Sequence, residues 1–295
     1  MTAALPEVGR LTSVLVKHAR DAFISQNVIN AQWRLLNFTA PPDFDQALAE
    51  YDAFLEVIAR TGAEIAELPK DQRLTLDSIY TRDASSVCAD GAILCSMGKA
   101  ARGAEPAAQE QELRRLGWPI AGRIAAPGLL EGGDLVWLDS RTLAVGLGHR
   151  TNAEGVRQLR VLLNGSIDEV MAVPLPQWRG SQDVMHLMSL VSPVDHDLAV
   201  IYSRLMPMAF REQLLQRGYR LVEVPDEEFE TMGANALALA PRVCLMVRGN
   251  PKTRAALERA GATVYEYEGR EISLKGGGGP TCLTRPLARE EAWRL

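Results

Sequence analysis

The chain alternates short apolar runs with longer stretches of helical composition, and this order recurs. Residues 78–97, 134–148, 185–203 and 234–249 each have the pattern of two apolar strands around a polar turn. In the first of these segments the turn is Ala-Asp-Gly, and Asp-Gly between apolar runs is typical of a β-hairpin. The pattern therefore predicts four hairpins.

Each predicted hairpin is followed by a helix and then by one more strand. The helices are expected near 105–117, 150–165, 207–217 and 252–262, and the strands near 120–125, 168–175, 219–225 and 263–269. The beginning of the chain fits more loosely, with a strand at 10–18, a helix at 43–61 and a strand at 63–68. Together these make about five strand–strand–helix–strand (ββαβ) units.

A recurrence of roughly 55 residues predicts radial repetition, because an isolated hairpin is marginal and needs neighbours to cover its apolar face. The alternative is a doubly wound α/β sheet, which also alternates strands and helices. The paired strands before each helix favour the repeat. Since the sequence has no evident linker, we expect residues 1–295 to form a single catalytic domain.

Composition narrows the function classes. The 295 residues are 47% hydrophobic, enough for a full core, and the net charge of −5 comes with no basic stripe for nucleic acid. No apolar run approaches the ~18 residues of a membrane span, and no secretory leader is evident. The four cysteines form no C-x-x-C pair, which argues against a disulfide scaffold and a structural zinc site. We expect a cytoplasmic protein with reduced thiols.

The segment "GGGGPTC", residues 276–282, contains the first candidate for chemistry. Glycines allow the backbone to approach a ligand closely and to adopt positive φ. Consecutive backbone N–H groups near a thiol favour the thiolate, which is the nucleophilic form. The alternative is that Cys282 is a buried structural cysteine, the commoner situation for a free thiol.

A nucleophilic cysteine needs a histidine from elsewhere in the chain. His186 is expected in the first strand of the hairpin at 185–203, among apolar neighbours, where a histidine is more often part of the core. His18, His149 and His196 are the competitors. His196 lies in a turn-like segment, so we expect it to be exposed to solvent.

Two acidic segments and one basic residue complete the set of candidates. "LLEGGDLVW" contains Glu131 and Asp134, and "LDSIYTRDAS" contains Asp77, Arg82 and Asp83. Turn chemistry would explain each segment, but carboxylates beside glycines at a strand end could equally face a cationic ligand. In "HRTNAEG", Thr151 and Glu154 match a capping box at a helix start. This leaves Arg150 without a structural explanation.

Five short motifs, taken together, resemble those of the guanidine-modifying superfamily. They are "DSIYTRD", "LEGGD", "HRTNAEG", "MHLMS" and "GGGGPTC", in the order and approximate spacing of that group, over roughly residues 75–285. The superfamily includes arginine deiminases, amidinotransferases and dimethylarginine dimethylaminohydrolases. The resemblance implies a five-bladed α/β propeller, the pentein fold, which agrees with the repeat.

The resemblance also implies catalytic roles. Cys282 matches the nucleophile and His186 the histidine of the family. Glu131 matches a carboxylate that binds the guanidinium and orients the histidine, and Asp83 matches an aspartate that binds guanidinium nitrogens. In this reading Cys282 attacks the guanidinium carbon, His186 protonates the leaving amine, and water releases a urea product from a covalent thiouronium intermediate.

Further positions concern the substrate. By the same resemblance, Asp77 and Arg150 hold its amino-acid end, and Arg82, in the deiminase-like "YTRD", is assigned to substrate binding. Deiminases and amidinotransferases have an aspartate two residues after the histidine, where this chain has Met188. A less polar pocket suits a methylated guanidinium. Met188 therefore favours dimethylarginine hydrolysis.

The alternatives are an arginine deiminase and, from a different class, a non-catalytic propeller that only binds. The partner that the resemblance implies is a small guanidino compound. No metal or organic cofactor is required, because the carbon under attack is already part of a cation. The sequence leaves the oligomeric state open, with a homodimer as one alternative.

Overall fold

The computed structural model describes residues 7–178, 180 and 185–290. Their strands form five three-stranded sheets. The sheets contain β15 (Arg285–Glu290), β1 (Arg10–Val16) and β2 (Glu64–Glu67); β3 (Ser85–Cys88), β4 (Gly91–Leu94) and β5 (Ile120–Arg123); β6 (Leu135–Trp137), β7 (Thr142–Leu147) and β8 (Glu169–Pro174); β9 (Val191–Asp195), β10 (Leu198–Ile201) and β11 (Arg220–Glu223); and β12 (Leu237–Ala240), β13 (Val243–Val247) and β14 (Thr263–Tyr267).

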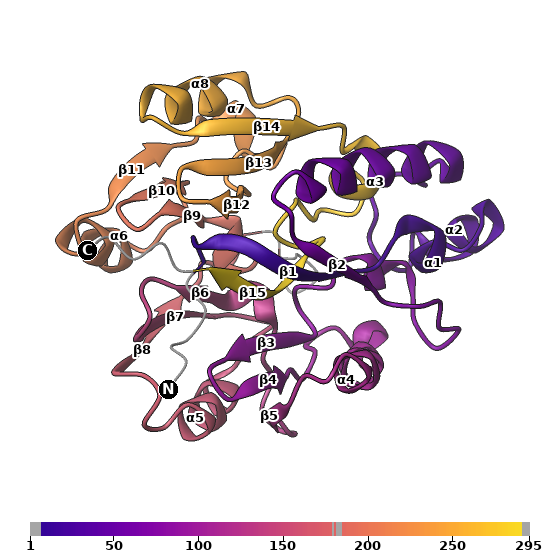
Figure 1. Cartoon of the computed structure of the whole chain (residues 1–295), viewed down its shortest axis with the longest axis horizontal. Coiled ribbons are helices and arrows are strands. Elements are labelled where there is room, and N and C mark those ends of the chain that lie inside the picture. The colour runs from indigo at the N-terminus through magenta and orange to yellow at the C-terminus, as the bar shows by residue number, and fades with distance from the viewer. Residues whose placement is uncertain (1–6, 179, 181–184, 291–295) are drawn as a thin grey trace.

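Four of the sheets repeat one connection. Two antiparallel strands form a hairpin, a helix follows, and the third strand pairs in parallel with the second. The connecting helices are α4 (Glu105–Arg115), α5 (Ala153–Leu162), α6 (Met208–Gln216) and α8 (Pro251–Arg259). Figure 1 shows the five sheets arranged around a centre, with these helices at the periphery. The predicted ββαβ repeat and propeller are confirmed, and the doubly wound sheet is wrong.

The remaining sheet is closed by the two ends of the chain. β1 pairs antiparallel with β15 and parallel with β2, and α3 (Phe44–Ala59) connects β1 to β2. β15 thus takes the place that the first hairpin strand has in the other sheets. The beginning of the chain fits the repeat loosely because its hairpin partner lies more than 260 residues away in sequence.

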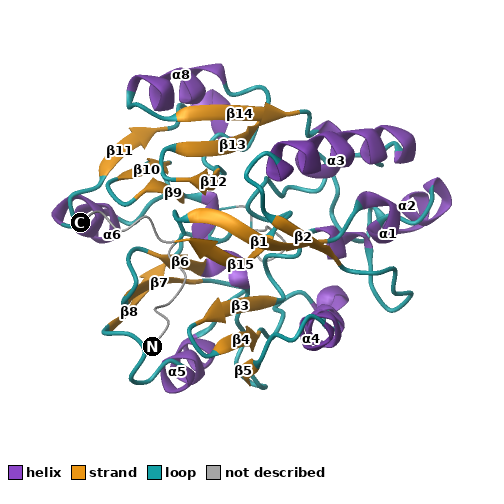
Figure 2. Ribbon diagram, in the orientation of Figure 1, coloured by secondary structure: helices purple, strands orange, loops and turns teal. Residues whose placement is uncertain are grey.

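Short helices α1 (Ala19–Ala22), α2 (Gln26–Gln32) and α7 (Asp226–Phe229) were not predicted. Figure 2 shows α1 and α2 beside α3, on the outer side of the sheet that contains β1. No helix in the described ranges has the length and apolar character needed to cross a membrane.

The hydrophobic core lies between neighbouring sheets. One cluster joins Leu15 of β1 and Leu287 of β15 to Val87 of β3 and Leu94 of β4, all buried. Other clusters join the remaining sheets to one another and to helices α1–α3. Because each sheet covers its neighbour's apolar face, the loops at the centre are held by packing that surrounds them.

Candidate active site

A cavity of about 270 Å³ lies where loops from several sheets meet. Five of the seven residues that the resemblance singles out line it: Asp77, Asp83, Arg150, His186 and Cys282. These residues span more than 200 positions in the sequence, so the fold assembles them. A concave site that gathers several charged groups and a thiol is a candidate catalytic centre.

Cys282 differs from the other cysteines in its exposure. Cys88, Cys95 and Cys244 are buried, whereas Cys282 is only half-buried and faces the cavity. Burial and the nearby carboxylate of Asp83 raise the pKa of the Cys282 thiol above its ordinary value. The sequence-based expectation of a thiolate therefore does not describe the free protein, in which the neutral thiol is favoured.

The glycine run before Cys282 passes directly over an aromatic ring. A Cβ atom on Gly278 would lie 2.4 Å from the ring of Tyr80, and one on Gly276 would lie 2.0 Å from its hydroxyl oxygen. Gly277 has a φ of +78°, in the left-handed region that favours glycine. The run therefore lets the chain reach the cavity wall in a path that larger residues would block.

Asn235 holds the turn that follows the glycines. Its Oδ1 accepts hydrogen bonds from the Thr281 backbone N–H at 3.0 Å and from the Thr281 hydroxyl at 2.9 Å. Its Nδ2 donates toward the Cys282 Sγ at 3.6 Å. Asn235 was not predicted; the one sequence signal is a polar residue at the entry to the hairpin at 234–249.

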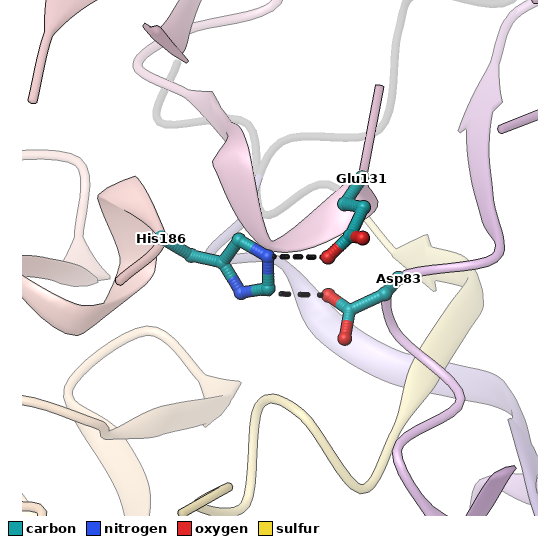
Figure 3. Close-up of side chains that lie close together, drawn as sticks. All are labelled: Asp83, Glu131 and His186. Atoms are coloured by element: carbon teal, nitrogen blue, oxygen red, sulfur yellow. Dashed lines mark hydrogen bonds and ion pairs between the residues drawn. The ribbon is translucent and has the colours of Figure 1, made fainter. Parts of the chain in front are cut away.

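The His186 imidazole faces two carboxylates, those of Glu131 and Asp83, which lie side by side (Figure 3). Its Nε2 is 2.8 Å from the Glu131 Oε2 and its Nδ1 is 3.7 Å from the Asp83 Oδ1. Burial alone would lower the pKa of the imidazole, but Asp83, Asp134 and Glu131 outweigh it and raise that pKa above its ordinary value. The structure thus favours a protonated His186 at neutral pH.

The expected position of His186 in a strand is wrong. It precedes a 3₁₀ turn at Leu187–Ser189, and β9 begins only at Val191. The Leu187 backbone N–H donates to the Asp134 Oδ1 at 3.0 Å. His186 therefore projects from a turn that Asp134 holds in place.

Glu131 is fully buried and does not line the cavity. Besides its bond to His186, its other oxygen accepts from the Gly98 backbone N–H at 2.8 Å. This geometry fits orientation of the histidine. It does not support the predicted contact between Glu131 and a guanidinium group.

Thr151 belongs to this network and not to a helix cap. Its hydroxyl donates to the Asp134 Oδ2 at 2.6 Å and accepts from the Glu131 backbone N–H at 3.2 Å. The cap of α5 is Asn152, whose side chain accepts from the Gly155 backbone N–H. The predicted capping box is therefore wrong, and α5 begins at Ala153, slightly later than the expected start near residue 150.

Asp83 is paired with an arginine that was not predicted. Its Oδ2 lies 2.6 Å from the Arg102 Nη1, and Arg102 also donates from Nε and Nη2 to the two oxygens of Glu105, at 2.9 and 2.8 Å. Arg102 and Glu105 stand three residues apart near the start of α4, a spacing that suggests an ion pair but not a site. Both Arg102 and Asp83 line the cavity, and the ion pair between them holds the Asp83 carboxylate in a fixed position there.

Asp77 and Arg150 line the cavity and also have protein partners. The Asp77 Oδ2 is 2.6 Å from the Lys99 Nζ, and the Arg150 Nη1 is 3.5 Å from the Glu131 Oε1. Lys99 lines the same cavity, and no motif in the sequence pointed to it. The Arg150 Nη1 is buried and makes no hydrogen bond among the described residues.

The placement of Arg82 corrects the prediction. Its side chain is buried, 2% exposed, and does not line the cavity that contains Cys282 and His186. Instead it donates from Nε to the Thr281 carbonyl at 3.1 Å and lies 3.4 Å from the carboxylate of Glu7. Arg82 therefore contacts the turn that contains Cys282 from outside the cavity, where its side chain is not placed to bind a substrate.

Met188 does line the cavity. Met185, Met232 and Phe229 line it as well. The position where deiminases have an aspartate thus belongs to a wall with a large apolar share. This arrangement fits an alkyl group better than an additional N–H donor.

Asp83, Glu131 and His186 place one potential ligand atom each within 4.8 Å of one another, close enough to consider a metal ion. His186 already shares a hydrogen bond with Glu131, and the Asp83 carboxylate already accepts from Arg102 and from the Gly133 backbone N–H. Their arrangement is therefore that of a hydrogen-bonded charge network that serves the histidine.

Comparisons with known proteins show which family the chain resembles. A family model described as "N,N dimethylarginine dimethylhydrolase, eukaryotic" matches residues 25–289. Dimethylarginine dimethylaminohydrolase of Pseudomonas aeruginosa is 28% identical over 245 residues, which cover 82% of this chain and 89% of that one. The Streptomyces coelicolor enzyme of the same name is 32% identical over 220 residues, covering 74% and 78%.

Solved structures share the fold. The P. aeruginosa enzyme, as a cysteine-to-serine variant complexed with citrulline, superimposes with a TM-score of 0.75 and 23% identity over 94% of this chain and 99% of that one. An arginine deiminase of Mycobacterium avium is also similar in sequence, 31% identical over 191 residues, but these cover only 55% of this chain and 46% of that one. On the match to the family model and on the Streptomyces relative, the chain belongs to the dimethylarginine dimethylaminohydrolase family of the pentein superfamily.

Proposed function

We propose that this protein hydrolyses Nω-methylated arginine, asymmetric dimethylarginine in particular, to citrulline and an alkylamine. The observation that supports this most directly is the half-buried Cys282 in one cavity with a histidine that faces two carboxylates. A nucleophile with a separate, charged proton donor is what substitution at a guanidinium carbon requires.

The substrate cation completes the site. In the free protein the pKa of the Cys282 thiol is raised, so the thiol holds its proton. A guanidinium group beside Asp83 adds positive charge next to the sulfur, which lowers the cost of forming the thiolate. Binding and activation of the nucleophile are thereby coupled, and a cationic substrate is favoured.

The first chemical step forms a carbon–sulfur bond and breaks a carbon–nitrogen bond. The Cys282 thiolate attacks the central guanidinium carbon, and the protonated His186 transfers its proton to the departing amine. The product of this step is dimethylamine and a thiouronium group attached to Cys282. Glu131 and Asp83 stabilise His186 in the protonated form before the step, through the contacts at 2.8 and 3.7 Å.

The second step restores the enzyme. His186, now neutral, takes a proton from water as the oxygen attacks the thiouronium carbon. The carbon–sulfur bond then breaks as the proton that remains on the attacking oxygen is released to solvent, where the departed amine takes one up. Citrulline leaves, and Cys282 returns as the thiolate beside a protonated histidine. Both steps use the same imidazole, which explains why one histidine oriented by Glu131 is sufficient.

The test is an assay of citrulline formation with arginine, monomethylarginine, asymmetric dimethylarginine and agmatine. We expect the methylated arginines to have the highest kcat/KM, with dimethylamine released in equal amounts from the dimethylated substrate. Cys282→Ser should lose turnover by at least about 10³-fold while retaining its melting temperature. A serine variant with near wild-type turnover would exclude the assignment.

An arginine deiminase is the second candidate, because a curated arginine deiminase shares 31% identity over 191 residues. The apolar side chain of Met188 in the cavity wall argues against it. Ammonia release from arginine at a kcat/KM well above that for dimethylarginine would establish this candidate and exclude the first.

A further inference from the structure

One residue holds two consecutive carbonyl groups of the turn that contains the nucleophile. The backbone N–H of Arg82 donates to the Cys282 carbonyl at 3.1 Å, and its side-chain Nε donates to the Thr281 carbonyl at 3.1 Å. The next residue, Asp83, faces the cavity. A single stretch of backbone therefore fixes both the cysteine turn and a carboxylate that lines the cavity.

Arg82 is itself fixed from the side away from the cavity. Its carbonyl accepts a hydrogen bond from the Arg285 Nη2 at 2.6 Å, and its Nη1 lies 3.4 Å from Glu7. A buried guanidinium is costly unless it is paired and hydrogen-bonded. These contacts keep a permanent positive charge behind Cys282 that solvent does not screen.

This charge acts on the thiol. Around Cys282 lie the carboxylate of Asp83, the amide of Asn235, the hydroxyl groups of Thr281, Tyr80 and Tyr267, and the imidazole of His186 across the cavity. Burial and Asp83 raise the pKa of the thiol, whereas Thr281, Arg82 and Asn235 lower it. Arg82 is thus a cation that lowers the pKa of the Cys282 thiol, and its side chain lies outside the cavity.

We propose that Arg82 is a positioning residue for Cys282: it holds the nucleophile's turn through Thr281 and Cys282, and its charge favours the thiolate. The proposal rests on the proposed function, in which Cys282 is the nucleophile. It replaces the role in substrate binding that the motif "YTRD" suggested. Because its side chain lies outside the cavity, Arg82 should affect kcat and thiol reactivity but not KM.

The experiment measures the alkylation rate of Cys282 by iodoacetamide against pH, together with kcat and KM, in Arg82→Met and Arg82→Lys. We expect Arg82→Met to move the alkylation midpoint upward by roughly one pH unit and to lower kcat by about 10- to 100-fold, with KM within about twofold of wild type. Arg82→Lys retains the charge, so its midpoint should stay near wild type while kcat falls.

The matched control is Arg289→Met. Arg289 is a second buried arginine, bonded to the carbonyls of Gly9 and Ala238 and not to the cysteine turn. The Arg289→Met variant should have a lower melting temperature than wild type but the same midpoint for alkylation of Cys282. If Arg82→Met does not fold, Arg82→Lys decides: wild-type kcat in that variant overturns the proposal.

Two other outcomes would also overturn it. An unchanged alkylation midpoint in a folded Arg82→Met shows that the charge does not act on the sulfur. A tenfold rise in KM with kcat unchanged restores the substrate-binding role. Alkylation does not require turnover, so an expected midpoint shift in a protein that hydrolyses no guanidino compound would contradict the proposed function alone.

Discussion

The amide nitrogen of Asn235 lies 3.6 Å from the sulfur of Cys282, toward which it donates a hydrogen bond. The oxygen of the same amide accepts from both the backbone N–H and the hydroxyl of Thr281. Asn235, just before β12, thus contacts the nucleophile Cys282, which lies in the segment between β14 and β15. The contact joins residues 47 positions apart.

Removing the Asn235 amide should reduce catalytic activity more than it reduces folding stability. In Asn235→Ala the Thr281 N–H loses its acceptor and the thiolate loses a donor, so we expect a destabilisation of about 1–3 kcal/mol and at least a tenfold loss of kcat. Asn250→Ala is the control, because Asn250 is equally buried and binds the carbonyls of Thr231 and Val247. Denaturant unfolding and iodoacetamide alkylation compare the two. Equal alkylation rates in both variants would contradict a role for Asn235 at the sulfur.

The path of the glycine run predicts different costs for neighbouring glycines. In Gly278→Ala the new Cβ would lie 2.4 Å from the Tyr80 ring, so the loop must move and Cys282 with it. We expect at least a 100-fold loss of kcat. Gly62→Ala is the control: Gly62 has a φ of +76° and nothing within 4 Å of the added atom, so it should cost about 1 kcal/mol and no activity. Similar kinetics for the two variants would show that the contact with Tyr80 does not matter.

Met188 predicts substrate preference. Replacing it with asparagine introduces a hydrogen-bonding group at a cavity wall that is otherwise rich in methionine. We expect Met188→Asn to raise the ratio of kcat/KM for arginine to that for dimethylarginine by about tenfold, the scale of one methyl-sized or polar difference in a pocket. Met185→Asn, also at the cavity, serves as the control and should lower kcat/KM for both substrates by the same factor. An unchanged ratio in Met188→Asn would remove the argument from the missing aspartate.

The repeat of the fold could be predicted because it is local. Each hairpin, helix and parallel strand lies within about 55 consecutive residues, and the hydrophobic pattern of each element indicates its type. β15 could not be found in this way, because its partner β1 is at the other end of the chain. Its residues Arg285–Glu290 contain two buried arginines, which do not resemble a core strand.

The candidate site was predictable where motifs exist and not where charges only meet in space. Cys282, His186 and Asp83 were found through segments that resemble a family. Arg102 was missed because its role depends on Asp83, which lies 19 residues away and on another element. Arg82 was misplaced for the opposite reason: its neighbour faces the cavity, and sequence alone does not tell which of two adjacent side chains points inward.

The paired shifts at the site predict an alkaline optimum. The reaction requires the Cys282 thiolate and the protonated His186, and the pKa values of both groups are raised in the free protein. At neutral pH the histidine is already protonated and the thiol is not yet ionised. We therefore expect kcat/KM to increase by close to tenfold per pH unit between about pH 6 and 8, to level off where the imidazole loses its proton, and to fall once both groups are deprotonated, on the alkaline side.

Glu131→Gln separates the two limbs of this profile. Glu131 is one of the carboxylates that raise the pKa of His186, so its loss should move the descending limb to lower pH. The ascending limb, which reports the thiol, should stay in place, because Asp83 is the carboxylate that acts on Cys282. His196→Asn, at an exposed turn, should leave both limbs unchanged. Initial rates at substrate concentrations below KM give the profile, and a wild-type rate that is flat or falling between about pH 6 and 8 would contradict the assignment of the two groups.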